Sequence, residues 1–90
     1  MKARAHLYVN GLVQGVFFRS KTLTEASYRQ VIGWVRNLPD GRVEAVFEGE
    51  QEKIVEMINF CKKGPTLARV NKVEVLWEDY TGSFKSFSIR

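Results

Sequence analysis

The chain has 90 residues, 44% of them hydrophobic, and a formal net charge of +4 at pH 7. This size and apolar fraction predict one packed domain, residues 1–90, rather than a disordered chain. No apolar run approaches the roughly 18 residues of a membrane span, and the N-terminus lacks a signal-peptide pattern, so we expect no membrane contact. The single cysteine, Cys61, cannot form an internal disulfide; this fits a reducing compartment, and we expect a cytoplasmic protein.

The first half of the chain predicts a strand, a helix and a hairpin. Residues 3–13 alternate between apolar and polar side chains, which is typical of a strand with one buried face. Residues from about 20 to 30 contain good helix formers and neither glycine nor proline, and they predict a helix. Residues 33–49 predict two short strands around Pro39-Asp40-Gly41, because proline presets φ and glycine accepts a positive φ.

The second half predicts a second helix and two further strand segments. Residues 50–63 place Ile54, Met57, Ile58 and Cys61 on one helical face, and Gly64-Pro65 ends this helix. Residues 69–80 predict a long strand, and residues 83–90 either continue it or add a fifth strand. The order β-α-β-β-α-β predicts an α+β, ferredoxin-like split βαβ fold, an antiparallel sheet with both helices on one face.

The charges at the start of the first predicted helix are unusual. Arg19 and Lys21 lie in or beside its first turn, and no acidic residue appears before Glu25. The positive end of the helix dipole disfavours such cations by about 0.3–1 kcal/mol each. A bound anion would remove this penalty, and Gly15 allows the preceding backbone to approach a ligand closely. The stretch QGVFFR therefore predicts an anion-binding cradle; the alternative is a plain turn with a solvated Arg19.

Two longer motifs resemble those of a known family. The stretch VNGLVQGVFFR, residues 9–19, resembles the acylphosphatase signature apolar-x-Gly-x-Val-Gln-Gly-Val-x-Phe-Arg, and GWVRNLPDGRVEAVFEG, residues 33–49, resembles the second signature. The similarity continues through GPTLARV and the closing FSI, so it covers nearly the whole chain.

This resemblance implies a metal-independent enzyme without cofactors that hydrolyses the carboxyl-phosphate bond of acyl phosphates. It implies that Arg19 binds the phosphate, that Asn37 positions the attacking water, and that backbone amides form the phosphate cradle. The cradle residues would be Gln14, Gly15, Val16, Phe17, Phe18 and Arg19. The expected partners are a small-molecule acyl phosphate and inorganic phosphate, with no nucleic acid and no membrane, and we expect a monomer. Apart from the resemblance, Asn37 has the alternative of a turn-forming residue.

Three positions depart from what the resemblance leads us to expect. Arg29 and Gln30 stand where the family usually has a leucine and a helix-ending glycine, which predicts a cost in stability because a glycine there would adopt the left-handed conformation cheaply. We expect the methylenes of Arg29 to lie along the edge of the core with the charged head in water. Phe17 is bulky for a loop near phosphate, so we expect only its amide to act and its ring to point away or to line the mouth of the site.

Other functional classes fit the sequence less well. An RNA-binding module of the same topology would carry several aromatic residues on its third strand, but RVEAVFEG has one aromatic and two acidic residues. A metal chaperone would need a Cys-x-x-Cys loop, and Cys61 is the only cysteine. An inactive domain, or one that serves a larger carbamoyl-transfer system, is disfavoured by the intact Arg19 and Asn37. His6 is expected to be a surface or hydrogen-bonded residue rather than a catalyst.

Overall fold

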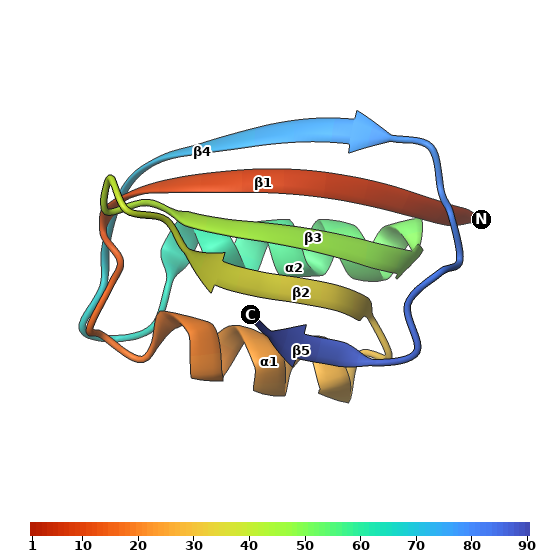
Figure 1. The fold of residues 1–90 in the computed structure, drawn as a ribbon, viewed down its shortest axis with the longest axis horizontal. Coiled ribbons are helices and arrows are strands. Elements are labelled where there is room, and N and C mark those ends of the chain that lie inside the picture. Colours follow the sequence, from red (N-terminus) through yellow and green to blue (C-terminus); the bar gives the residue numbers. More distant parts are fainter.

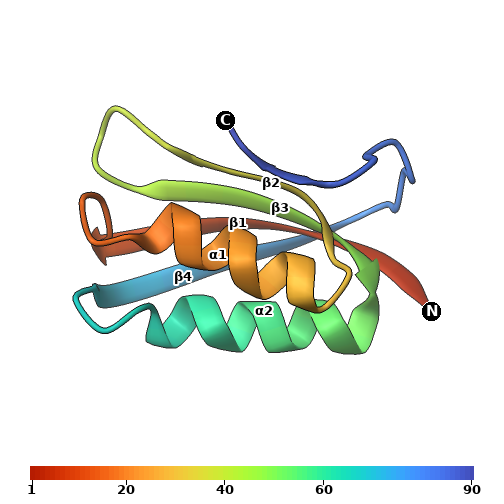
Figure 2. The ribbon, with the colours of Figure 1, turned by 90° about the horizontal axis from the view of Figure 1, so that it is seen from below.

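Both helices pack on one face of a five-stranded sheet (Figures 1 and 2). The structure is a computed structural model, and it describes residues 1–90. The elements are β1 Lys2–Leu12, α1 Phe18–Tyr28, β2 Ile32–Asn37, β3 Val43–Glu50, α2 Gln51–Lys63, β4 Arg69–Glu78 and β5 Phe87–Ile89. The predicted α+β, ferredoxin-like fold is confirmed. Neither helix is long and apolar enough to cross a membrane.

The strand order across the sheet is β4-β1-β3-β2-β5. β1 lies between β3 and β4 and pairs with both in antiparallel fashion, and β2 pairs antiparallel with β3. The last segment of the chain adds a fifth strand instead of extending β4, and it runs parallel to β2 with Ile89 opposite Val35. The connection from β4 to β5 crosses the end of the sheet (Figure 1). This crossing carries the C-terminus to the edge next to α1.

The core lies between the sheet and the two helices. Alternate residues of β1 face it, as the sequence predicts: Ala5, Leu7 and Val9 are fully buried. The apolar face of α2 covers these strands, and its members Ile54, Met57, Ile58 and Cys61 are all buried. Burial raises the pKa of the Cys61 thiol to about 12, so Cys61 behaves as a packing residue, as predicted.

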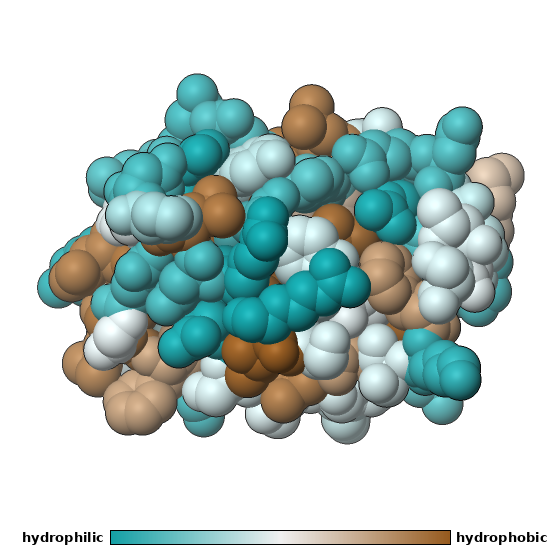
Figure 3. Space-filling model, viewed as in Figure 1, coloured by the Kyte–Doolittle hydropathy of each residue, from teal (hydrophilic) through white to brown (hydrophobic).

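The opposite face of the sheet is largely hydrophilic (Figure 3). Two glutamates of β3, Glu44 and Glu48, are nevertheless buried there, and each is compensated by neighbouring donors. His6 contacts Glu44 Oε2 through Nε2 at 2.6 Å and Glu78 Oε2 through Nδ1 at 3.1 Å. Arg4 donates to Glu48 at 3.0 Å and to Glu78 at 2.8 Å. His6 is therefore a hydrogen-bonded structural residue, as expected.

Helix α1 begins at Phe18, two residues before the predicted start, and ends at Tyr28. Its apolar stripe is narrow, and only Phe18, Thr22 and Ala26 are buried. Arg29 follows the helix, and its guanidinium pairs with Glu25 at 2.7 Å and with Glu56 of α2 at 2.9 Å. The expectation that its head lies free in water is thus wrong, because acids on both helices surround it. These pairs link α1 to α2.

Candidate active site

The loop between β1 and α1 turns sharply at two residues with left-handed backbone conformations. Gly15 has φ 73° and Phe17 has φ 66°. The conformation is cheap for glycine, but it costs about 1 kcal/mol or more for Phe17. The side chains of Val13, Val16 and Phe18 are buried and anchor the loop to the core. Such strain in a non-glycine residue is typical of functional sites, where the surrounding packing enforces it.

The backbone N–H groups of this loop have no partner in the chain. None of the amides from Gln14 to Phe18 donates a hydrogen bond to another group of the protein. Helix α1 has no side-chain cap and no acidic residue in its first turn. Unpaired amides that follow alternating left-handed residues form a concave anion-binding nest, and the helix dipole adds positive potential at the same place. The loop therefore has the chemistry of an anion cradle.

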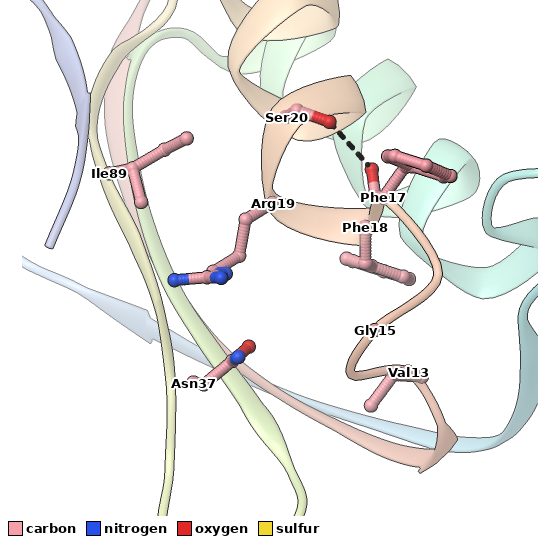
Figure 4. Close-up of a pocket in the computed structure, with 8 residues that line it drawn as sticks. All are labelled: Val13, Gly15, Phe17, Phe18, Arg19, Ser20, Asn37 and Ile89. Carbon is pink, nitrogen blue, oxygen red and sulfur yellow. Dashed lines mark hydrogen bonds between the residues drawn. The ribbon is translucent and has the colours of Figure 1, made fainter.

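Arg19 is the second residue of α1, and it is exposed. Its guanidinium makes no ion pair and no hydrogen bond within the chain, in contrast to those of Arg4, Arg29, Arg36 and Arg42, which all pair with acids. Figure 4 shows its guanidinium extending towards the side chain of Asn37. A fixed positive charge without a counter-charge, beside unpaired amides, strengthens the site's preference for an anion.

Asn37 is the last residue of β2, and its carboxamide faces Arg19 across the site (Figure 4). Its Oδ1 atom is buried and has no hydrogen-bond partner. An unsatisfied buried acceptor costs about 1–3 kcal/mol, so such an atom in a folded protein needs an explanation. A ligand or a water held between Asn37 and the cradle would supply the missing donor.

These groups surround one cavity of about 380 Å³. Of the predicted site residues, Gly15, Phe17, Phe18, Arg19 and Asn37 line it; Val13, Ser20 and Ile89 line it as well.

Two predicted residues, Gln14 and Val16, do not line the cavity. The side chain of Val16 is in the core, and that of Gln14 points to the β2–β3 turn. The ring of Phe17 is directed away from Arg19 (Figure 4), as expected. Sequence reasoning missed Ile89 because nothing in the local pattern showed where the last strand pairs.

The fold and the site together define an α+β domain that presents unpaired amides, a free arginine and an asparagine at one end of its sheet. The family model for acylphosphatase matches residues 5–89. The chain belongs to the acylphosphatase family.

Individual relatives agree with this assignment. The chain is 50% identical to an acylphosphatase of Pelotomaculum thermopropionicum over 88 residues, 98% of this chain and 96% of the relative. It is similar to the crystal structure of the acylphosphatase from Bacillus subtilis, with TM-score 0.93, 33% identity and coverage of 100% and 99% of the two chains. It is also similar to an acylphosphatase structure from Coxiella burnetii, with TM-score 0.94, 35% identity and coverage of 99% and 93%. Family membership supports hydrolysis of acyl phosphates as the activity.

Proposed function

We propose that this chain hydrolyses acyl phosphates by in-line attack of a water that Asn37 positions on a phosphate held by Arg19 and the loop amides. The observation that carries the proposal is that hydrogen-bond donors and an unsatisfied acceptor face each other across one small cavity. Unpaired donors, Arg19 and the amides, lie on one side, and the unsatisfied carbonyl of Asn37 lies on the other.

The cradle would bind the phosphoryl group. The unpaired loop amides at the cavity donate to its oxygens, and the guanidinium of Arg19 presents a planar fork that stays protonated at every working pH. Phosphoryl transfer leaves the protein little covalent chemistry, so positioning and charge stabilisation dominate. These donors follow the negative charge as it spreads over the equatorial oxygens in the transition state.

Asn37 would orient the nucleophile. Its Oδ1 accepts a hydrogen bond from the water, and its neutral amide is too weak a base to remove the proton. The water oxygen bonds to phosphorus as the bond from phosphorus to the acyl oxygen breaks, and the leaving group departs as a carboxylate. The proton of the water passes to a phosphate oxygen of the substrate. A carboxylate is a good leaving group, and a loose transition state asks little of the nucleophile.

The proposal includes catalysis without a metal ion or cofactor. No group of three or more His, Cys, Asp or Glu side chains in the chain is arranged to hold a metal, and the proposed steps use only an arginine, an asparagine and backbone amides. We further infer a monomer that acts in the cytoplasm on small acyl phosphates and interacts with neither nucleic acid nor membranes.

Release of phosphate from benzoyl phosphate tests the proposal. We expect hydrolysis that a chelator does not reduce, a loss of about 10³-fold or more in kcat/KM for Arg19→Ala, and about 10²-fold for Asn37→Ala. Lys21→Ala is the matched control, because Lys21 lies in the same helical turn and is exposed but does not line the cavity. It removes one positive charge and should change kcat/KM by no more than about threefold.

Three results would contradict this assignment. Absence of hydrolysis above the background rate would refute the proposed enzyme activity. Loss of activity in the presence of a chelator would refute the metal-free mechanism. If Lys21→Ala reduced kcat/KM as much as Arg19→Ala, the positive potential at the start of the helix, and not a specific contact of Arg19, would account for the activity. Inorganic phosphate should also compete with the substrate and raise the melting temperature, because it binds the folded state alone.

A further inference from the structure

We propose that Gln14 is a positioning residue whose side chain locks the phosphate cradle to the strand end that carries Asn37. This inference rests on the proposed function, because it assigns Gln14 an effect that acts through Asn37. The sequence signature places Gln14 in the cradle through its backbone amide. The structure shows that its side chain has a separate set of contacts.

The carboxamide of Gln14 spans the gap between two parts of the site. Its Nε2 atom donates to the carbonyl oxygen of Leu38 at 2.8 Å and to that of Arg42 at 2.9 Å. These partners are 24 and 28 residues away in the chain. Leu38 directly follows Asn37, so the first of these bonds acts on the residue next to the proposed water-positioning group. Both N–H groups of the carboxamide are used in this way.

The turn has no other such link to the cradle. The remaining hydrogen bonds of residues 38–42 close the turn on itself: Leu38 N–H donates to Arg42 O at 2.8 Å, and Gly41 N–H donates to Leu38 O at 3.1 Å. Asp40 accepts from the amide of Arg42 at 3.1 Å. These bonds set the shape of the turn, but they do not fix its distance from the loop 13–17. The pairing of β3 with β1 and β2 holds the base of the turn, and Gln14 supplies the hydrogen bonds that join the turn itself to the loop 13–17.

Loss of the carboxamide should leave the fold intact. The carbonyl of Leu38 keeps the amide of Gly41 as a donor, and the carbonyl of Arg42 keeps the amide of Leu38. Neither acceptor is therefore orphaned when Gln14 is replaced, which avoids the main cost of deleting a buried hydrogen bond. The cradle amides remain in place as well, because Val13, Val16 and Phe18 anchor the loop. What changes is the position of Asn37 relative to the cradle.

Gln14→Leu tests this assignment, because leucine has a similar size and no donor. We expect kcat for benzoyl phosphate to fall by about tenfold or more, since a displacement of about 1 Å can cost 100-fold in rate. KM and the inhibition constant of inorganic phosphate should stay within about twofold, because phosphate binding uses the cradle and not Asn37. In ¹⁵N-labelled protein, the side-chain amide resonances of Asn37 should shift or broaden.

Asp40→Ala is the matched control. It removes the carboxylate contacts to Arg42 that stabilise the same turn, but it leaves the link from Gln14 to the turn in place. We expect it to lower the melting temperature while kcat stays within about twofold and the Asn37 resonances stay unchanged.

The proposal is overturned if Gln14→Leu leaves kcat unchanged, if the phosphate inhibition constant rises in step with the loss of kcat, or if Asp40→Ala reduces kcat equally. These results concern only the role of Gln14. The proposed function itself would instead be contradicted by an inactive wild type or by a fully active Asn37→Ala variant. An active wild type that needs Asn37 but is indifferent to Gln14→Leu would refute only the role of Gln14.

Discussion

The end of helix α1 shows how one backbone conformation limits the stability of this domain. Gln30 has φ 59°, in the left-handed region, and its side chain is exposed. Its N–H donates to Ser27 O at 3.2 Å, and the N–H of Val31 donates to Ala26 O at 2.9 Å. These are the two hydrogen bonds of a Schellman motif, and they place Gln30 where glycine is usually found. The helix therefore ends in the usual way, but with a strained residue.

Replacing Gln30 with glycine should stabilise the protein. A residue with a Cβ atom pays about 1–2 kcal/mol in the left-handed region. Glycine avoids this cost but loses about 0.5–1 kcal/mol more backbone entropy on folding. The exposed glutamine side chain makes no hydrogen bond within the chain that would be lost. The net gain is about 0.5–1 kcal/mol, which for a domain of this size raises Tm by about 2–8 °C.

Thermal and urea unfolding of Gln30→Gly and Gln30→Ala measure this effect. Alanine removes the same side chain atoms beyond Cβ but keeps the strain, so Gln30→Ala should show no comparable gain. Benzoyl phosphate hydrolysis should be unchanged in both variants, because Gln30 does not line the cavity. A lower Tm for Gln30→Gly, or an equal gain for both variants, would refute the explanation based on backbone strain.

Two further predictions concern the cradle and the charged face of the sheet. Phe17→Gly keeps the left-handed conformation and the amide, so we expect a higher Tm and kcat/KM within about threefold of the wild type; a large loss of kcat would show that the ring takes part. Burial of Glu48 alone would raise its pKa, but donors from Thr81, Arg4 and Gly82 outweigh this and lower the pKa below its ordinary value. A lowered carboxyl pKa stabilises the folded state above its unfolded pKa of about 4.3, and this contribution is lost as the pH falls through the folded value. Glu48→Gln should therefore lower the free energy of unfolding at pH 7 by about 3 kcal/mol and flatten its decline below about pH 5; an equal acid slope in both proteins, measured by urea unfolding, would contradict this.

The sequence predicts those features of the candidate site that depend on residues close together in the chain. The absence of acids beside Arg19 and Lys21 indicates an anion at the start of the helix, and the structure places the unpaired Arg19 beside unpaired amides there. The resemblance named Asn37, and the structure places it across the cavity from Arg19. The second role of Gln14 was not visible, because its partners Leu38 and Arg42 are brought near only by folding.

Arg29 and Ile89 show the same limit. The sequence predicts a solvated head for Arg29, because its partner Glu56 belongs to the other helix and no spacing near the end of α1 reveals that contact. The pattern of residues 83–90 does not assign Ile89 to the site, and it lines the cavity because β5 pairs parallel with β2 at the edge of the sheet.

The sequence by itself determined the order of the two helices and the first four strands, the buried faces of β1 and α2, the turn at Pro39-Asp40-Gly41 and the loop chemistry before α1. Apolar periodicity, turn residues and helix-end charges are local properties, and they act over a few neighbouring residues. Only the tertiary structure decided where β5 pairs, which side chains complete the cavity, and that Gln14 reaches the turn beyond Asn37. Those contacts join segments far apart in the chain, and they depend on strand register and on which sheet edge is free after the core has packed.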